Sequence, residues 1–156
     1  MAKTAPRKKT PANPPRAAKP STTSIDAPAE IKFRRVVPLL RIFDVAKAKE
    51  FYVGFLGFRV VFEHRFEGAT PIYLEVVRDG LALHLTEHHG DCCPGSTVFV
   101  WMVGVEALHA ELHAKNYGYL KPGIEDTDMG FRCLETIDPF GNKLRFAESN
   151  GPLVAG

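Results

Sequence analysis

The stretch from Leu39 to Tyr52 (LLRIFDVAKAKEFY) joins a strand pattern directly to a helix pattern. Residues 36–43 form an apolar run that is broken by Arg41, which is typical of a buried strand. Asp44 then suits the N-cap of a helix. Apolar residues follow at helical spacing, namely Val45, Ala48, Tyr52, Phe55 and Leu56. We therefore predict a strand over 36–43 and a helix from Asp44 to about Gly57.

Three more strands are predicted after this helix. Residues 58–64, 71–78 and 81–88 have extended patterns, and residues 67–70 have the composition of a turn. Asp79-Gly80 is a strong signal for a tight hairpin between the last two strands. Residues 36–88 therefore form one module of a strand, a helix and three strands.

The same order of elements returns in residues 96–148. The predicted elements are a strand (97–103), a helix from Gly104 to Tyr117-Gly118, a short strand (119–124), a polar loop (125–130), and two strands (131–137 and 143–148) joined by the turn Asp138-Pro139-Phe140-Gly141-Asn142. A repeat on this scale predicts two copies of one structural unit. Paired modules of this kind enclose a cavity that faces away from their helices.

The first thirty residues differ in composition from the rest of the 156-residue chain. They hold six of the twelve prolines, with six basic and two acidic side chains, a net charge of +4 in a chain whose total is +2. Such a segment buries too little apolar surface to offset its ordering entropy. We predict a disordered basic tail over 1–30, whose plainest role is a solvated arm without a nucleic-acid partner, and a folded domain over 31–156.

The cellular location of the protein is predicted from its apolar segments and its cysteines. No apolar run is long enough to span a bilayer, and the N-terminus lacks the apolar core of a signal peptide. The three cysteines, Cys92, Cys93 and Cys133, are an odd number that suits free thiols in a reducing compartment. We predict a cytoplasmic protein with no membrane partner.

Side-chain alternation divides each central strand into two faces. One face is aliphatic or aromatic and is expected to pack on the helices, as with Leu83 and Leu85. The other face mixes His, Arg, Thr, Phe and Trp. That mixture suits the wall of a wet, ligand-sized pocket better than a dry core.

Several of these segments resemble the vicinal oxygen chelate (VOC) superfamily. Residues 39–52, Leu56-Gly57-Phe58 and the turn over 138–142 carry the resemblance, and residues 83–91 are similar to its bleomycin-resistance-like branch. This superfamily includes glyoxalase I, extradiol dioxygenases and fosfomycin resistance enzymes. The resemblance implies an α+β fold in which two βαβββ modules (36–88 and 96–148) form a curved mixed sheet around a cleft. It also implies a homodimer whose two subunits together build the ligand grooves.

The resemblance also implies where a metal would bind in the enzymes of this superfamily. The matching positions here are Val37, His84, Thr97 and Arg145. Valine offers no donor, a lone threonine hydroxyl is a poor one, and arginine is a fixed cation. Since a catalytic site needs about three protein ligands, we expect neither a metal site nor another cofactor. A single divalent ion held by His84, His88 and Glu75 or Glu135 is the alternative.

The mixed faces supply the candidate ligand-binding residues, while no catalytic residue is assigned. His84 is the leading candidate because its neighbours on that face are polar, and Phe99 and Trp101 would stack on a flat ligand. The ordinary alternatives are a satisfied sheet histidine, core aromatics and surface charge. The full predicted set is Arg41, His84, Thr86, His88, Phe99, Trp101 and Arg145.

These residues favour a binding protein over an enzyme. The first hypothesis is a metal-independent binder of a small, partly aromatic molecule, which confers antibiotic resistance by sequestering the drug. The second is a metal-dependent lyase, isomerase or dioxygenase of the same superfamily. A third is an interaction module recruited by its basic tail. Because the arginines would make the cleft basic, a carboxylate or phosphate ligand is favoured over cationic bleomycin.

Overall fold

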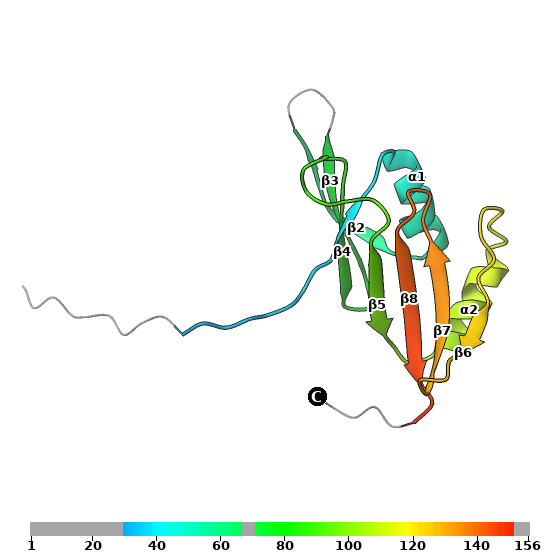
Figure 1. Ribbon diagram of the computed structural model, residues 1–156. Helices are drawn as coiled ribbons and strands as arrows, with labels where there is room; N and C mark the ends of the chain where they lie inside the picture. Colours follow the sequence, from blue (N-terminus) through cyan, green and yellow to red (C-terminus); the bar gives the residue numbers. More distant parts are fainter. Residues whose placement is uncertain (1–29, 67–70, 152–156) are drawn as a thin grey trace, which may run out of the picture. The chain divides into compact units, whose positions relative to one another are not determined.

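The computed structural model describes residues 30–66 and 71–151 (Figure 1). The chain divides into two units, residues 1–34 and 35–156. Of the first unit, residues 30–34 are described; they have no regular secondary structure, and Lys32 pairs with Glu30 at 2.9 Å. The predicted turn over 67–70, and the predicted tail except for Glu30, lie outside the described residues.

The first module contains the elements that the sequence predicts. They are β1 (Leu39–Arg41), α1 (Val45–Lys49), η1 (Glu50–Phe55), β2 (Arg59–Arg65), β3 (Ile72–Arg78) and β4 (Leu81–Thr86). The strands form a four-stranded sheet in the order β1-β4-β3-β2, in which β1 runs parallel to β4 and the other pairs are antiparallel. Asp79 and Gly80 both have positive φ, as the predicted tight hairpin requires.

The second module repeats this topology. Its elements are β5 (Thr97–Trp101), α2 (Val105–Ala114), β6 (Ile124–Asp126), β7 (Phe131–Ile137) and β8 (Lys143–Ser149). The strand order is β5-β8-β7-β6, again with one parallel pair, β5 and β8 (Figure 1). The predicted two-module α+β fold is confirmed. The modules contribute two separate mixed sheets rather than one continuous sheet.

The first helix begins as predicted but changes its winding. Asp44 caps it by accepting a hydrogen bond from the backbone N–H of Lys47 at 2.9 Å. After Lys49 the helix continues as the wider π-helix η1, a feature that helical spacing alone does not distinguish. Tyr52 and Phe55 are buried in η1. Gly57 ends the segment with φ of +73°, which favours glycine.

The second helix begins with a carboxylate supplied from the last strand. Gly104 has φ of +89° and no side chain with which to cap α2. Glu148 on β8 fills this role, because its two carboxylate oxygens accept from the N–H groups of Gly104 and Val105 at 2.7 and 3.0 Å. These two hydrogen bonds are the main cause that lowers the pKa of Glu148.

One predicted strand is wrong. We expected residues 119–124 to form a strand and 125–130 a loop, but β6 spans Ile124–Asp126 and residues 119–123 are irregular. Pro122 has no N–H with which to join a ladder, and its carbonyl oxygen lies 2.8 Å from Nε2 of His113 on α2. Residues before Ile124 thus contact α2 instead of pairing with β7.

The core lies between the helices and the apolar faces of both sheets, as the side-chain alternation predicted. Its buried residues come from both modules, including Leu40, Leu83, Leu85, Leu144 and Phe146 from strands and Phe51, Phe55 and Leu112 from helices. Full burial of one such side chain contributes roughly 1.5–3 kcal/mol. None of the helices in the described part of the chain has the length and apolar character needed to cross a membrane.

A buried carboxylate joins the two modules. Asp138, in the predicted turn before β8, accepts hydrogen bonds from Tyr52 Oη at 2.8 Å and from the N–H groups of Phe140 and Asn142. Asn142 Nδ2 donates to Asp138 at 2.8 Å and to the carbonyl oxygen of Arg41 on β1 at 2.7 Å. We call Tyr52, Asp138 and Asn142 the junction; all three are buried.

We predict that Tyr52→Phe lowers the free energy of unfolding by about 1.5–3 kcal/mol at neutral pH, because it removes a hydrogen bond to a charged group. Burial, together with Asp138, raises the pKa of Tyr52 well above its usual range. The stability from this group is therefore fully present below the pKa of an unfolded tyrosine, about 10, and declines above it. Urea unfolding at pH 7 to 11 measures both effects.

Tyr119→Phe is the matched control, since the Tyr119 hydroxyl donates only to the Asp138 backbone carbonyl, at 3.2 Å, and its ring is exposed. We expect that control to cost less than about 1 kcal/mol. Tyr117, whose pKa burial raises to about 12, will retain part of the alkaline slope in both variants. Equal losses in the two variants would contradict the role of the junction.

Candidate functional site

His84 lies on the mixed face of the first sheet and both of its ring nitrogens have neighbours. Its Nδ1 atom is 2.7 Å from Tyr73 Oη, and its Nε2 atom is 3.8 Å from Glu75 Oε2. Glu75 also pairs with Arg35 at 2.8 Å. Burial is the main cause that raises the pKa of Tyr73, so its hydroxyl stays protonated. His84 is therefore held in one orientation by the strand β3.

Thr86 and His88 sit where β4 ends, but they differ in exposure. Thr86 has no exposed surface; its hydroxyl donates to Asp91 at 2.6 Å and accepts from the His88 N–H at 3.0 Å. Its predicted contact with a ligand is therefore not supported in a single chain, since the loop after β4 folds over it. His88 is exposed, with Nδ1 3.5 Å from an oxygen of Asp91.

Phe99 and Trp101 lie on the mixed face of the second sheet and are exposed by 44% and 54%. Together with the buried Phe131 they form a cluster in which every pair of rings meets edge to face, with centroids 5.1 to 5.5 Å apart. Edge-to-face contacts stabilise aromatic clusters. They fix the rings while leaving part of their surface open.

Arg145 lies beside this cluster, opposite Phe99 in the register of β5 and β8. Its Nε donates to Glu135 at 2.7 Å, and Lys143 pairs with the same carboxylate at 3.1 Å. The hydrogen bond from Arg145 is the main cause that lowers the pKa of Glu135. The second mixed face is thus less basic than the sequence suggested, because this carboxylate partly neutralises its cations.

The seven predicted residues fall into two groups. Arg41, His84, Thr86 and His88 belong to the first sheet or the loop after it, while Phe99, Trp101 and Arg145 belong to the second sheet. Neither of the two grooves described below contains both groups. A single chain therefore presents two half-surfaces, which we call the first and second mixed faces.

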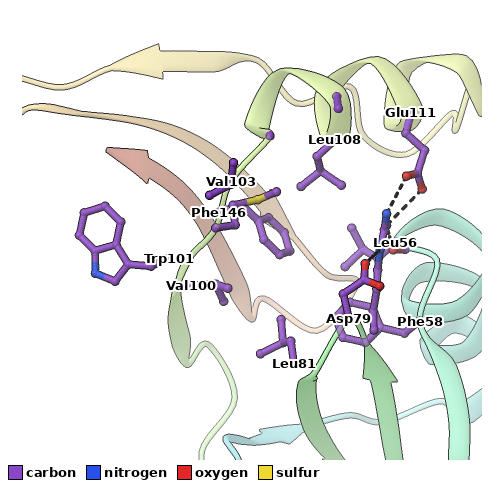
Figure 2. A pocket seen from close by; sticks show the side chains of 14 residues that line it. Leu56, Phe58, Asp79, Leu81, Val100, Trp101, Val103, Leu108, Glu111 and Phe146 are labelled. Carbon is purple, nitrogen blue, oxygen red and sulfur yellow. Dashed lines mark hydrogen bonds and ion pairs between the residues drawn. The ribbon is translucent and has the colours of Figure 1, made fainter. Parts of the chain in front are cut away.

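An apolar groove that the sequence did not predict lies between the modules (Figure 2). It has a cavity volume of about 660 Å³, within the usual range for ligand pockets. Its apolar wall includes Leu56, Phe58, Leu81, Val100, Leu108 and Phe146. Trp101 is the one predicted site residue that lines it, and Figure 2 shows its indole turned away from the other side chains.

An ion pair marks one end of the apolar groove. Arg78 donates to Glu111 at 3.1 and 2.6 Å and to the carbonyl oxygen of Leu56 at 2.5 Å. Of the lining residues, Leu81, Val100 and Phe146 lie on strand faces that alternation assigns to the core. No local pattern reveals that such side chains border an opening, so the groove follows from how the two modules pack.

The His, Cys, Asp and Glu side chains of the described residues are not grouped as the ligands of a catalytic metal ion would be. Within residues 30–66 and 71–151, no three or more His, Cys, Asp or Glu side chains are placed to hold a metal. His84 has neighbours at both ring nitrogens, and Glu135 is paired with two cations on the other sheet. The alternative donor set of His84, His88 and Glu75 or Glu135 is therefore not assembled in the described chain.

Solved structures share this fold. An antibiotic-binding protein, TnmS3 from Streptomyces sp. CB03234, is 21% identical with a TM-score of 0.60, covering 77% of this chain and 99% of its own. A bleomycin resistance determinant encoded on transposon Tn5 is 19% identical (TM-score 0.59; 76% and 100% covered). The bleomycin-binding protein of Streptomyces verticillus, in complex with copper(II)-bleomycin, is 26% identical (TM-score 0.57; 75% and 97% covered).

A comparison with protein families decides the relationship. No curated protein matches the chain closely enough to be counted as a relative. The sequence profile described as a glyoxalase superfamily protein, however, matches residues 21–152, which include both modules and most of the chain. With the repeated topology and the shared fold, this match shows that the chain belongs to the glyoxalase superfamily.

Proposed function

We propose that this protein binds a small, partly aromatic molecule and sequesters it without metal-dependent catalysis. Sequestration requires only affinity, so it needs no assembled metal ligands. The structural neighbours include proteins described as antibiotic-binding and as bleomycin resistance determinants, which supports an antibiotic as the ligand. Action in the cytoplasm agrees with the three free cysteines of the described chain.

The observation that carries this proposal is the open aromatic cluster on the second mixed face. Phe99 and Trp101 expose about half of their surface, and the buried ring of Phe131 packs against both of them on the same face of the sheet. Aromatic side chains supply large contact areas and stack on flat ligands. The paired cations of Arg145 and Lys143 border the cluster and leave hydrogen-bonding groups at its edge.

We infer that the complete site needs two copies of the chain. The predicted ligand residues divide between two sheets, so each chain holds two half-surfaces. A C₂ dimer presents the same pair of faces twice. The first mixed face of one subunit would then meet the second mixed face of its partner and enclose a ligand between them. The exposed apolar side chains Val103 and Phe43 are consistent with a surface that becomes covered.

We predict that Trp101→Ala weakens ligand binding by about three- to tenfold, the loss expected for one aromatic contact. Isothermal titration calorimetry with bleomycin, an anthraquinone and a neutral naphthalene derivative measures the affinity. Trp101 is the chain's single tryptophan, so quenching of its fluorescence in the unchanged protein reports binding beside Trp101, at the second mixed face or in the adjoining apolar groove.

Two variants control this experiment. Tyr119→Ala removes an aromatic ring with the same 54% exposure from outside both faces, and it should leave the affinity unchanged. Ala107→Phe partly fills the apolar groove from the exposed side of α2. If Ala107→Phe loses binding and Trp101→Ala does not, the ligand binds in the apolar groove instead. If none of the compounds releases heat on titration, the result would argue against this class of ligand.

A separate prediction concerns assembly. Sedimentation velocity should show twice the chain mass of 17.3 kDa at micromolar concentration. Acrylamide should quench Trp101 less efficiently in the dimer than after dilution, because the second mixed face becomes covered. A monomer at every concentration, with ligand bound at one molecule per chain, would contradict a site shared between subunits.

The metal content separates the proposal from the enzymatic alternative. Protein purified without chelator should contain well under one divalent ion per chain, because a structural or catalytic site needs three or four well-placed donors. His84→Ala should leave that content unchanged. One ion per chain that disappears in His84→Ala would favour a lyase, isomerase or dioxygenase instead. Elemental analysis of both proteins makes the measurement.

A further inference from the structure

A second groove lies at the edge of the first mixed face and holds a guanidinium that has no carboxylate partner in the described part of the chain. Its cavity volume is about 500 Å³, and it is lined by Arg41, Ile42, Phe43, Pro71, Glu87, His88 and His89. We call it the Arg41 groove. Among residues 30–66 and 71–151, no carboxylate lies within 4.0 Å of the Arg41 guanidinium; its one hydrogen bond goes to the carbonyl oxygen of Thr86, at 3.4 Å.

Arg35 and Arg145, two other arginines near the mixed faces, differ from Arg41 in this respect. Arg35 is paired with Glu75 and Arg145 with Glu135, each within 2.8 Å. A guanidinium has five N–H donors in a planar fork. Since Arg41 uses at most one of them, and weakly, most of its donors face the groove without a partner in the described chain.

The ring of Phe43 helps to fix the position of the Arg41 guanidinium. Arg41 is the last residue of β1, is half-buried, and packs over the ring of Phe43 with its Cζ 4.9 Å from the ring centroid. A cation over an aromatic face is held there by the ring quadrupole. A rigid fork loses little entropy when it binds a planar anion.

The acidic groups around this groove are committed to other donors. Glu87 accepts from the N–H of Ile72 at 3.0 Å. Asp91 accepts from the hydroxyl of Thr86 at 2.6 Å and lies beside Nδ1 of His88. Both carboxylates thus fix the loop after β4, and the guanidinium remains available to a ligand.

Part of the groove lining is aromatic. The rings of His88 and His89 are stacked, with centroids 5.3 Å apart and 15° between their planes, and both residues are exposed. Phe66 lies 6.4 Å from His88. A planar ring can pack against these imidazoles while a group attached to it reaches the guanidinium.

We propose that the Arg41 groove binds an aromatic carboxylate, with Arg41 pairing the carboxylate through its fork and His88 and His89 contacting the ring. This inference rests on the proposed small-molecule binding function and names a chemical class for part of the ligand. Bidentate pairing explains the preference for a planar carboxylate, which matches the fork, over a neutral amide of the same shape.

The test uses two probes of equal shape, 2-naphthoate and 2-naphthamide, titrated into the ¹⁵N-labelled full chain at fixed ionic strength. We expect naphthoate to bind at least about tenfold more tightly than naphthamide, since a charge-assisted pair contributes about 1.5–3 kcal/mol. The largest shifts in amide resonances should occur at residues 41–43 and 86–91. This comparison needs no variant.

Variants then assign the preference to Arg41. Arg41→Gln should reduce the affinity for naphthoate to that for naphthamide, while Arg41→Lys should keep part of the difference. Arg59→Gln, which removes an exposed arginine from β2 of the same sheet, should keep all of it. Circular dichroism and thermal melting check that each variant is folded.

Two results would overturn the proposal in distinguishable ways. Equal affinity for both probes, or an unchanged preference in Arg41→Gln, removes the carboxylate site but leaves small-molecule binding intact. Failure of both probes to bind also removes it, and the titrations with bleomycin and the anthraquinone then decide separately whether the proposed function survives.

Discussion

The buried carboxylate of Asp138 holds the two modules together through its hydrogen bonds. It accepts four hydrogen bonds: two from backbone N–H groups of the turn before β8, and one each from the side chains of Tyr52 and Asn142. Removing one of these donors leaves a buried acceptor less well satisfied, which costs about 1–3 kcal/mol. Since Asn142 also holds the carbonyl oxygen of Arg41, one turn joins η1, β1 and the second sheet.

This junction determines where the functional surfaces can form. It fixes the backbone of Arg41 from the second module, while the side chain of Arg41 lies in a groove with Phe43 and His88. The apolar sides of both sheets are buried in a core that they share with the helices. The remaining sides carry the aromatic cluster and the polar networks, so recognition must take place there or at the openings between modules.

On the mixed faces, several polar side chains of this scaffold are already engaged with one another. His84 is engaged by Tyr73 beside Glu75, and Arg145 is engaged by Glu135. These contacts satisfy the polar groups that would otherwise be available as ligands. Aromatic surface on the second mixed face remains exposed, and the Arg41 guanidinium has no carboxylate partner among residues 30–66 and 71–151.

Much of the architecture was determined by the sequence itself, because hydrophobic periodicity and turn chemistry are local properties. The repeat, the Asp44 cap, the Asp79-Gly80 hairpin and the apolar faces could all be predicted in this way. The tertiary structure alone decided the π-helical winding of η1, the position of β6, the burial of Thr86 and the partners of each arginine. Each of these depends on contacts between residues far apart in the chain, and the two grooves exist only because those contacts leave space between packed elements.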